Sequence, residues 1–134
     1  MKKSSLISIT AIAAAAVLGL SGCAADTAAP AGSTRACVIL PDADSGTRWE
    51  PGDRPALEKA LTDAGYEADI QNAQSDTAKF ATIADQQLSK GCGVMILVDY
   101  QGAGASVVEK AKAQGIPVIA YDRPIAGADY YVSF

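Results

Sequence analysis

From residue 37 to the end of the chain, short apolar runs alternate with stretches in which apolar residues recur every three or four positions. The runs predict strands at CVILP (37–41), YEADIQN (66–72), GVMILVD (93–99), IPVIA (116–120) and YYVSF (130–134). The third run is a continuous series of Val, Ile and Leu residues, as burial on both faces of a parallel sheet requires. The second run is more polar, so we expect it nearer an edge of the sheet.

Three helices are predicted between these strands, each closed by a glycine. Asp53 and Pro55 mark the first start, because an Asp cap satisfies free amides and proline suits the first turn. Ser75 or Asp76 caps the second helix, and the third covers 104–115. The apolar residues at helical spacing are Leu57, Ala60, Leu61 and Ala64 in the first helix, Phe80, Ile83, Ala84 and Leu88 in the second, and Val107, Val108 and Ala111 in the third.

Repeated strand-helix-strand units predict an α/β fold with a doubly wound parallel sheet, because such crossovers are right-handed. The expected strand order is 2-1-3-4-5, with the topological switch between the first and third strands. Ligands of such sheets bind beyond the carboxyl ends of the strands, near the switch. The residues predicted at this rim are Asp42, Asp44, Arg48, Trp49, Asn72, Asp99, Tyr100, Gln101, Asp122 and Arg123.

Two pairs at the rim have the chemistry of a sugar site. An indole offers an apolar platform for the C–H face of a sugar ring, and the only tryptophan, Trp49, follows Arg48 in a segment rich in turn formers that predicts a loop. Asp122 and Arg123 supply a paired acceptor and a fork of donors for neighbouring hydroxyls. The alternatives are that Trp49 covers the core and that Asp122 and Arg123 form a turn ion pair of small energetic value.

The glycine-rich GAGASV (102–107) follows a strand and opens a helix, as a dinucleotide fingerprint does. Three residues separate the strand from the first glycine, however, and Val107 stands where a third small residue is expected. These glycines are better explained as part of a loop and a helix start, and no cofactor is expected.

The amino-terminal segment predicts export. Lys2 and Lys3 precede an apolar stretch that is shorter than the ~20 residues of a membrane-spanning helix, which is typical of a signal peptide over 1–22. LSGC (20–23) has the form of a lipobox, in which Cys23 takes a lipid; the alternative is an ordinary signal with an incidental cysteine. Residues 23–35 lack large apolar side chains and predict a flexible tether, which leaves 36–134 as the folded part.

Charge and residue usage exclude several classes of function. The formal net charge is −4, and it becomes −6 without Lys2 and Lys3, which argues against nucleic acid as a partner. The chain has no histidine, so Ser-His-Asp and Cys-His catalysis are excluded and a zinc site is disfavoured.

Cys37 and Cys92 remain as a pair if Cys23 is lipidated. They lie near the amino ends of two strands that are expected to be neighbours, about 4.8 Å apart, within reach of a disulfide. We predict a Cys37–Cys92 bridge at the edge opposite the ligand rim; the alternative is two buried thiols.

Three stretches of the chain are RWEPGDRP, VVEKAKAQGIPVIAYDRPI and ADYYVSF. With them the chain resembles the amino-terminal part of the periplasmic sugar-binding proteins of bacterial ABC importers, in their D-xylose and multiple-monosaccharide branch. The resemblance covers roughly 36–134 and implies a type I periplasmic-binding-protein fold, in which two lobes close on a monosaccharide. It implies sugar contacts by Arg48, Trp49, Asp122 and Arg123. The spacer EPG after Trp49 is longer than expected and leaves the roles of Glu50, Asp53 and Arg54 open.

The resemblance implies an extracytoplasmic receptor that passes a xylose-like aldose to the permease subunits of an importer and has no enzymatic activity. The lipobox adds the expectation of a lipid anchor at Cys23. Since the sequence stops inside the fifth predicted strand, we expect a fragment that carries one incomplete lobe. A chemoreceptor or autoinducer-binding lipoprotein of the same fold is an alternative. A secreted glycosidase or Rossmann-like enzyme is a further one, but it would need paired carboxylates or a better glycine fingerprint.

Overall fold

A computed structural model describes residues 32–42 and 46–134, so the predicted signal peptide, Cys23, most of the predicted tether and Asp44 lie outside the described residues. The described elements are, in chain order, β1 (Arg35–Leu40), the π-helical turn η1 (Trp49–Asp53), α1 (Arg54–Asp63), β2 (Glu67–Asn72), α2 (Thr77–Lys90), β3 (Val94–Leu97), α3 (Ala103–Ala113), β4 (Val118–Tyr121) and β5 (Tyr130–Val132). The strands thus begin and end within about two residues of the predicted runs.

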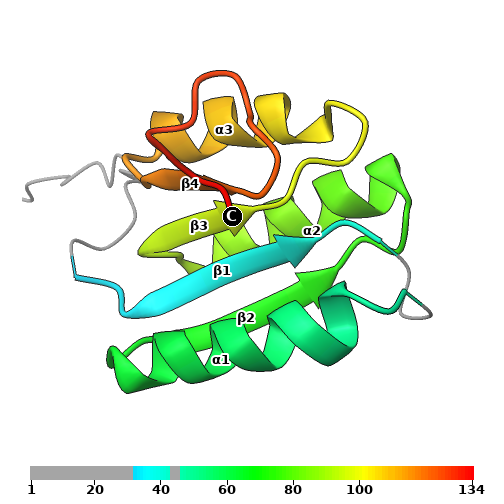
Figure 1. Cartoon of the computed structure of the whole chain (residues 1–134). Helices are drawn as coiled ribbons and strands as arrows, with labels where there is room; N and C mark the ends of the chain where they lie inside the picture. The colour runs from blue at the N-terminus through cyan, green and yellow to red at the C-terminus, as the bar shows by residue number, and fades with distance from the viewer. Residues whose placement is uncertain (1–31, 43–45) are drawn as a thin grey trace, which may run out of the picture.

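The strands form one parallel sheet in the order β2-β1-β3-β4-β5, which confirms the predicted α/β topology (Figure 1). Val38 in β1 pairs with Ile70 of β2 on one side and with Ile96 of β3 on the other. The more polar β2 lies at an edge, as its composition predicted. All five carboxyl ends therefore meet at one rim of the sheet.

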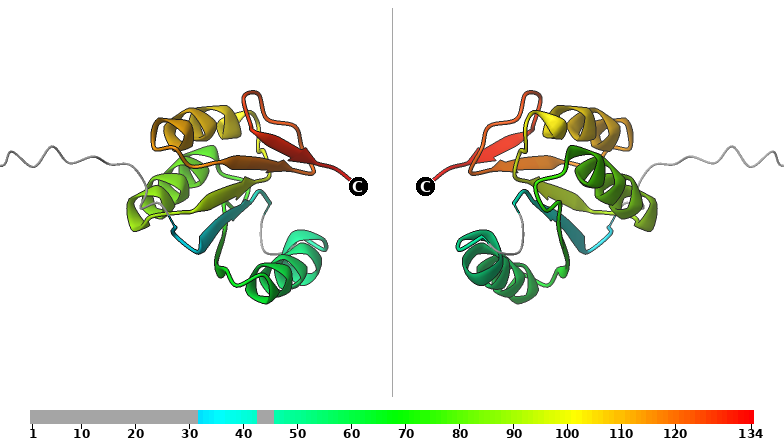
Figure 2. Two further views of the ribbon diagram at one scale, coloured as in Figure 1. Left: turned by 90° about the vertical axis from the view of Figure 1, so that its left-hand side faces the viewer. Right: turned by 90° about the vertical axis from the view of Figure 1, so that its right-hand side faces the viewer.

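Helices cover both faces of this sheet (Figure 2). Alternate residues of β1 belong to two separate cores, because successive side chains of a strand point to opposite faces. Cys37 and Ile39 pack with Phe80 of α2 and Val108 of α3 in one core. In the other core, the side chains beneath η1 and α1 are Val38, Leu40, Trp49, Ile70, Ile96 and Val98.

The first helix begins differently from the prediction. Asp53 has helical backbone angles and makes no capping bond, because η1 leads directly into α1 at Arg54. The amides of Gly52 and Asp53 donate to the carbonyl of Arg48, and that of Arg54 donates to the carbonyl of Trp49, so the backbone hydrogen bonds of η1 continue into α1 and Asp53 does not stand at a free helix start. No residue of α1 is buried, and only Leu57 and Leu61 pack partly against the core.

The second helix follows its prediction closely. The Asp76 carboxylate accepts from the amides of Ala78 (2.8 Å) and Lys79 (3.0 Å), which is the bond pattern of an N-cap. The predicted apolar face is buried, and Gln87 is buried with it. The Gln87 amide donates to the carbonyls of Asp69 (2.8 Å) and Val38 (3.3 Å), so this side chain joins α2 to two strands.

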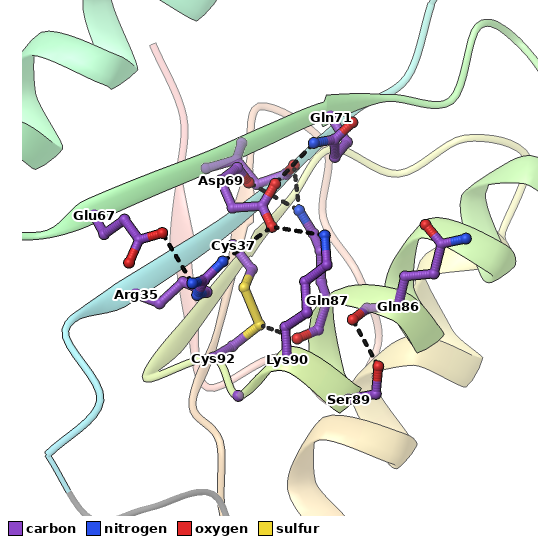
Figure 3. Close-up of polar contacts among 12 residues, drawn as sticks. Arg35, Cys37, Glu67, Asp69, Gln71, Gln86, Gln87, Ser89, Lys90 and Cys92 are labelled. Atoms are coloured by element: carbon purple, nitrogen blue, oxygen red, sulfur yellow. Dashed lines mark hydrogen bonds and ion pairs between the residues drawn. A yellow bond between two sulfur atoms is a disulfide. The ribbon is translucent and has the colours of Figure 1, made fainter.

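Cys37 and Cys92 form a disulfide with a Cα–Cα distance of 5.8 Å, which confirms the predicted pairing. Figure 3 shows the bridge beside Gln87 and near a group of charged side chains that includes Arg35 and Asp69. Arg35 pairs with Glu67 across β1 and β2 at 2.9 Å. The disulfide therefore ties β1 to the turn that enters β3, at the amino end of the sheet.

Candidate functional site

Arg48, at the start of η1, lies at the centre of the carboxyl rim. Its two terminal nitrogens contact both oxygens of Asp122, at 2.9 and 3.3 Å, and its Nε lies 3.4 Å from Asp53 Oδ2. The guanidinium carbon is 4.1 Å from the ring centroid of Trp49 and 4.9 Å from that of Phe134. The hydrogen bond with Asp122 is the main reason that the pKa of Arg48 is raised. The guanidinium is therefore bound along its edges by two carboxylates and lies near two aromatic rings.

Arg123 is held by a separate set of contacts. One terminal nitrogen donates to the carbonyl of Asp99 at 2.8 Å, and the other lies 3.5 Å from Asp42 Oδ2. Its Nε is 3.9 Å from Asp122. The main partner of Asp122 is thus Arg48 rather than its sequence neighbour, so a simple turn ion pair does not describe this rim.

Trp49 lies in the helical turn η1, whereas the sequence predicted a loop. Only 2% of the residue is exposed, and it packs against Leu40 and Val98 in the core beneath η1. Its indole nitrogen donates to Asp42 at 2.6 Å. The apolar residues beneath the turn explain this burial. Trp49 therefore contributes to the core and also makes a cation–π contact with Arg48.

Asp122 has a left-handed backbone conformation, with φ of 65°. Asp and Asn adopt this region more readily than other residues with a side chain. The Asp122 amide donates to the carbonyl of Val132 (2.8 Å), and Tyr131 Oη donates to the Asp122 carbonyl (3.1 Å). These two hydrogen bonds to residues of β5 fix the turn in which the Asp122 carboxylate faces Arg48.

Asn72 lies at the carboxyl end of β2, as predicted, but its side chain belongs to a cluster separate from Arg48 and Asp122. Its amide donates to Glu50 Oε1 at 2.6 Å, and its carbonyl oxygen accepts from the Gln74 amide at 2.7 Å. Glu50 also forms an ion pair with Arg54, which is the main reason that the pKa of the Glu50 carboxyl is lowered. Arg54 in turn donates to the Ile70 carbonyl at 2.7 Å. This cluster joins the start of α1 to the end of β2.

Asp99 and Tyr100 lie at the carboxyl end of β3, where the topology predicted them, but have other contacts. Both oxygens of Asp99 accept backbone amides, from Gly102 and Gly104, at 2.8 Å each. A Cβ atom at Gly104 would lie 2.7 Å from Asp99 Oδ1 and 2.8 Å from Ile125 Cδ1. The glycine-rich stretch therefore serves a close approach between loops. Tyr100 packs against the core formed with α2 and α3.

Sequence reasoning missed Asp53 and Tyr121 as members of this rim. Tyr121 Oη donates to Asp53 Oδ1 at 2.8 Å, and burial of the phenol, followed by this bond, raises the pKa of Tyr121 to about 12. Asp53 was predicted to cap a helix, and Tyr121 was given no role, because the predicted strand ended at Ala120. The position of a tyrosine at the carboxyl end of a central strand was the one signal that could have drawn attention to it.

Residues 32–42 and 46–134 contain neither a metal-binding cluster nor a membrane-spanning helix. No group of three or more His, Cys, Asp or Glu side chains in these ranges could hold a metal ion. Nor does any helix in them have the length and apolar character needed to cross a membrane.

The family model described as periplasmic binding protein domain matches residues 37–134. The chain belongs to this family. It is 33% identical over 90 residues to the D-xylose-binding periplasmic protein of Escherichia coli, a match that covers 65% of this chain and 27% of that protein. It is 31% identical over 131 residues to a multiple sugar-binding periplasmic receptor of Rhizobium radiobacter, covering 95% of this chain and 36% of the receptor.

A solved structure of a sugar-bound protein is also similar to this chain. The chain superposes with a TM-score of 0.67 and 32% identity on an ABC transporter solute-binding protein from Clostridium phytofermentans with bound β-D-glucose. The match covers 75% of this chain and 32% of that one. The relatives are sugar-binding proteins and not enzymes, and the chain spans about a quarter to a third of the length of these matched proteins.

Proposed function

We propose that this chain forms one lobe of a monosaccharide-binding site in an extracytoplasmic receptor that supplies an aldose, such as D-xylose, to an ABC permease. The observation that carries the proposal is the gathering of Arg48, Asp122 and Arg123 at the carboxyl rim of the sheet. The position is the one at which doubly wound folds bind ligands. Relatives named for D-xylose and for multiple sugars, and a solved structure with bound glucose, match the chain, and the family model spans residues 37–134, which include these three residues.

The chemistry of the rim suits a sugar. Arg48 and Arg123 offer fixed N–H donors, and Asp122 offers two acceptor oxygens, so neighbouring hydroxyls can be bound through charge-assisted hydrogen bonds. In the proposed complex the hydroxyls take over some of the contacts that Arg48 and Asp122 make with each other. Closure of a second lobe over the ligand would supply the rest of the affinity.

Titration of the full-length gene product with D-xylose, D-ribose, D-glucose and D-galactose tests this function. We expect saturable heat of binding with at least one aldose, and a loss of about tenfold or more in affinity in Asp122→Asn and Arg123→Met, since each removes a charged hydrogen-bonding group from the site. Lys59→Met and Asp63→Asn are the controls, because these residues form an exposed pair on α1. Absence of both heat and thermal shift with all four sugars would contradict the proposal.

We further propose that a lipid on Cys23 anchors the receptor to the outer face of the cell membrane. The proposal rests on the LSGC lipobox behind an apolar stretch. Metabolic labelling with a palmitate analogue should mark the wild-type protein and leave Cys23→Ser unlabelled. Equal labelling of both forms, or of neither, would contradict the anchor without bearing on sugar binding.

A further inference from the structure

The rotamer of Arg48 depends on residues other than those proposed to contact the sugar. Its side chain is 43% exposed, and an arginine has many rotamers in water. Holding such a side chain in one rotamer costs free energy at the moment of binding, unless the protein holds it beforehand. Besides Asp122, which would meet the sugar, Asp53 and the ring of Trp49 contact Arg48.

Asp53 is the group that contacts Arg48 from the side away from Asp122. The contact joins Asp53 Oδ2 to Arg48 Nε, at 3.4 Å, and leaves both terminal nitrogens directed at Asp122. The Asp53 side chain is only 11% exposed, so it lies beneath the guanidinium rather than at the surface where a ligand would enter. Asp53 can therefore orient Arg48 without itself competing for the ligand.

Tyr121 holds Asp53 in turn. Its hydroxyl donates to the other carboxylate oxygen, Oδ1, at 2.8 Å. With Oδ1 occupied in this way, the carboxylate plane is set and Oδ2 faces Arg48. The chain of contacts runs from the end of β4, through η1, to the rim, and each member comes from an element that is packed on the sheet.

We propose that Asp53 and Tyr121 are positioning residues for Arg48, which fix its guanidinium so that both terminal nitrogens are presented to the ligand. The proposal rests on the proposed function, because it assumes that Arg48 meets the sugar. Asp53 and Tyr121 act through Arg48 and make no contact with the ligand themselves. They thereby reduce the ordering that binding would otherwise require of the arginine.

The test is a set of titrations of the full-length gene product with the aldose that the wild type binds best. We expect affinity to fall about five- to twentyfold in Asp53→Asn and about two- to fivefold in Tyr121→Phe, because losing the carboxylate frees Arg48 while losing the hydroxyl only loosens the carboxylate. Asp63→Asn and Tyr66→Phe, at exposed positions on and after α1, are matched controls and should bind as the wild type does. Melting temperatures of all variants identify any general loss of stability.

A double-mutant cycle with Arg48→Lys separates positioning from a structural role. Lysine keeps the charge but has no Nε–H to contact Asp53, so Asp53→Asn should weaken binding less than twofold in this background. Equal weakening in both backgrounds would overturn the proposal, as would wild-type affinity in both Asp53→Asn and Tyr121→Phe. If Asp53→Asn fails to fold, the nearly isosteric Tyr121→Phe still decides. If the wild type binds no aldose, the proposed function fails and the positioning role fails with it; if the wild type binds and Arg48→Lys does not weaken binding, only the positioning role fails.

Discussion

At the scale of single residues, three aspartates organise the candidate site. Asp42 accepts the indole N–H of Trp49, Asp53 accepts the hydroxyl of Tyr121, and Asp122 binds Arg48 with both oxygens. Each carboxylate is thus occupied by a specific donor rather than by water alone. The donors of the rim consequently point in set directions, as the proposed binding of sugar hydroxyls requires.

The environment of Tyr121 leads to a prediction about pH. Its pKa is raised from 10.0 to about 12, because burial and the bond to Asp53 both favour the neutral phenol. Neutral Tyr121 therefore contributes stability that is fully present below pH 10 and is lost as the pH rises from 10 through about 12. We expect the ultraviolet absorbance of tyrosinate to show a late step in the wild type that is missing in Tyr121→Phe.

The same titration in Asp53→Asn provides the control, since a neutral amide opposes ionisation of Tyr121 less than a carboxylate does. The late step should therefore move to lower pH in Asp53→Asn. Superimposable curves for the wild type and Tyr121→Phe across the alkaline range would contradict the assignment.

At the scale of elements, local sequence signals predicted a helix start correctly where no distant segment bonded to the capping residue. Asp76 caps α2 as predicted, because its side chain and the amides it accepts are within three residues of each other. Asp53 looked equivalent in sequence but bonds to Tyr121, 68 positions away. The capping rule is therefore correct for Asp76 and wrong for Asp53, because the fold brings the hydroxyl of Tyr121 to the Asp53 carboxylate.

The beginning of α3 provides a prediction at this scale. Alanine usually favours a helix over glycine by about 1 kcal/mol, but a Cβ at Gly104 would lie within 3 Å of Asp99 and Ile125. Because overpacking costs about 1–3 kcal/mol, we expect Gly104→Ala to lower the free energy of unfolding in urea titrations. Gly52→Ala is the matched control, since a Cβ there would meet nothing within 4 Å. A Gly104→Ala protein as stable as Gly52→Ala would show that the loop holding Asp99 yields easily.

At the scale of the whole molecule, the sheet sets the rim and the disulfide secures the opposite end. The bridge joins β1 to the turn before β3 and leaves the carboxyl ends free (Figures 1 and 3). Both cysteines are fully buried, in the core that also contains Phe80 and Met95. The stabilisation and the ligand rim are therefore placed at separate ends of the same strands.

Reduction of this bridge should destabilise the fold considerably. Cys37 and Cys92 are 55 positions apart, a separation for which chain entropy predicts a stabilisation of about 4 kcal/mol. We expect the free energy of unfolding in guanidinium chloride to fall by about 2–4 kcal/mol with a reductant present, and the Cys37→Ala/Cys92→Ala variant to be insensitive to it. Alkylation of both cysteines in the native protein without reductant, seen by peptide mass spectrometry, would contradict the bridge.

For the residues of the rim, the sequence predicted the position of each residue in the sheet but not the contacts of its side chain. Asn72 lies at the end of β2 as predicted, yet its side chain bonds to Glu50 rather than to the rim cluster. Asp99 lies at the end of β3, yet both its oxygens accept amides of the following loop. Parallel topology determines the end of the sheet at which a residue lies, but not the donor that its side chain will find.

From the sequence alone we predicted the alternation of strands and helices, the order of the parallel sheet and the bridge between Cys37 and Cys92, and the structure confirms all three. These predictions rest on periodicity, handedness and spacing along the chain, whereas the edge at which a ligand binds stays a prediction. Only the tertiary structure decided that Asp122 pairs with Arg48, that Trp49 is buried, and that Asp53, bonded to Tyr121, contacts Arg48. These contacts join residues from η1 and β4, and no local pattern encodes which of several charged side chains at a shared rim will be nearest neighbours.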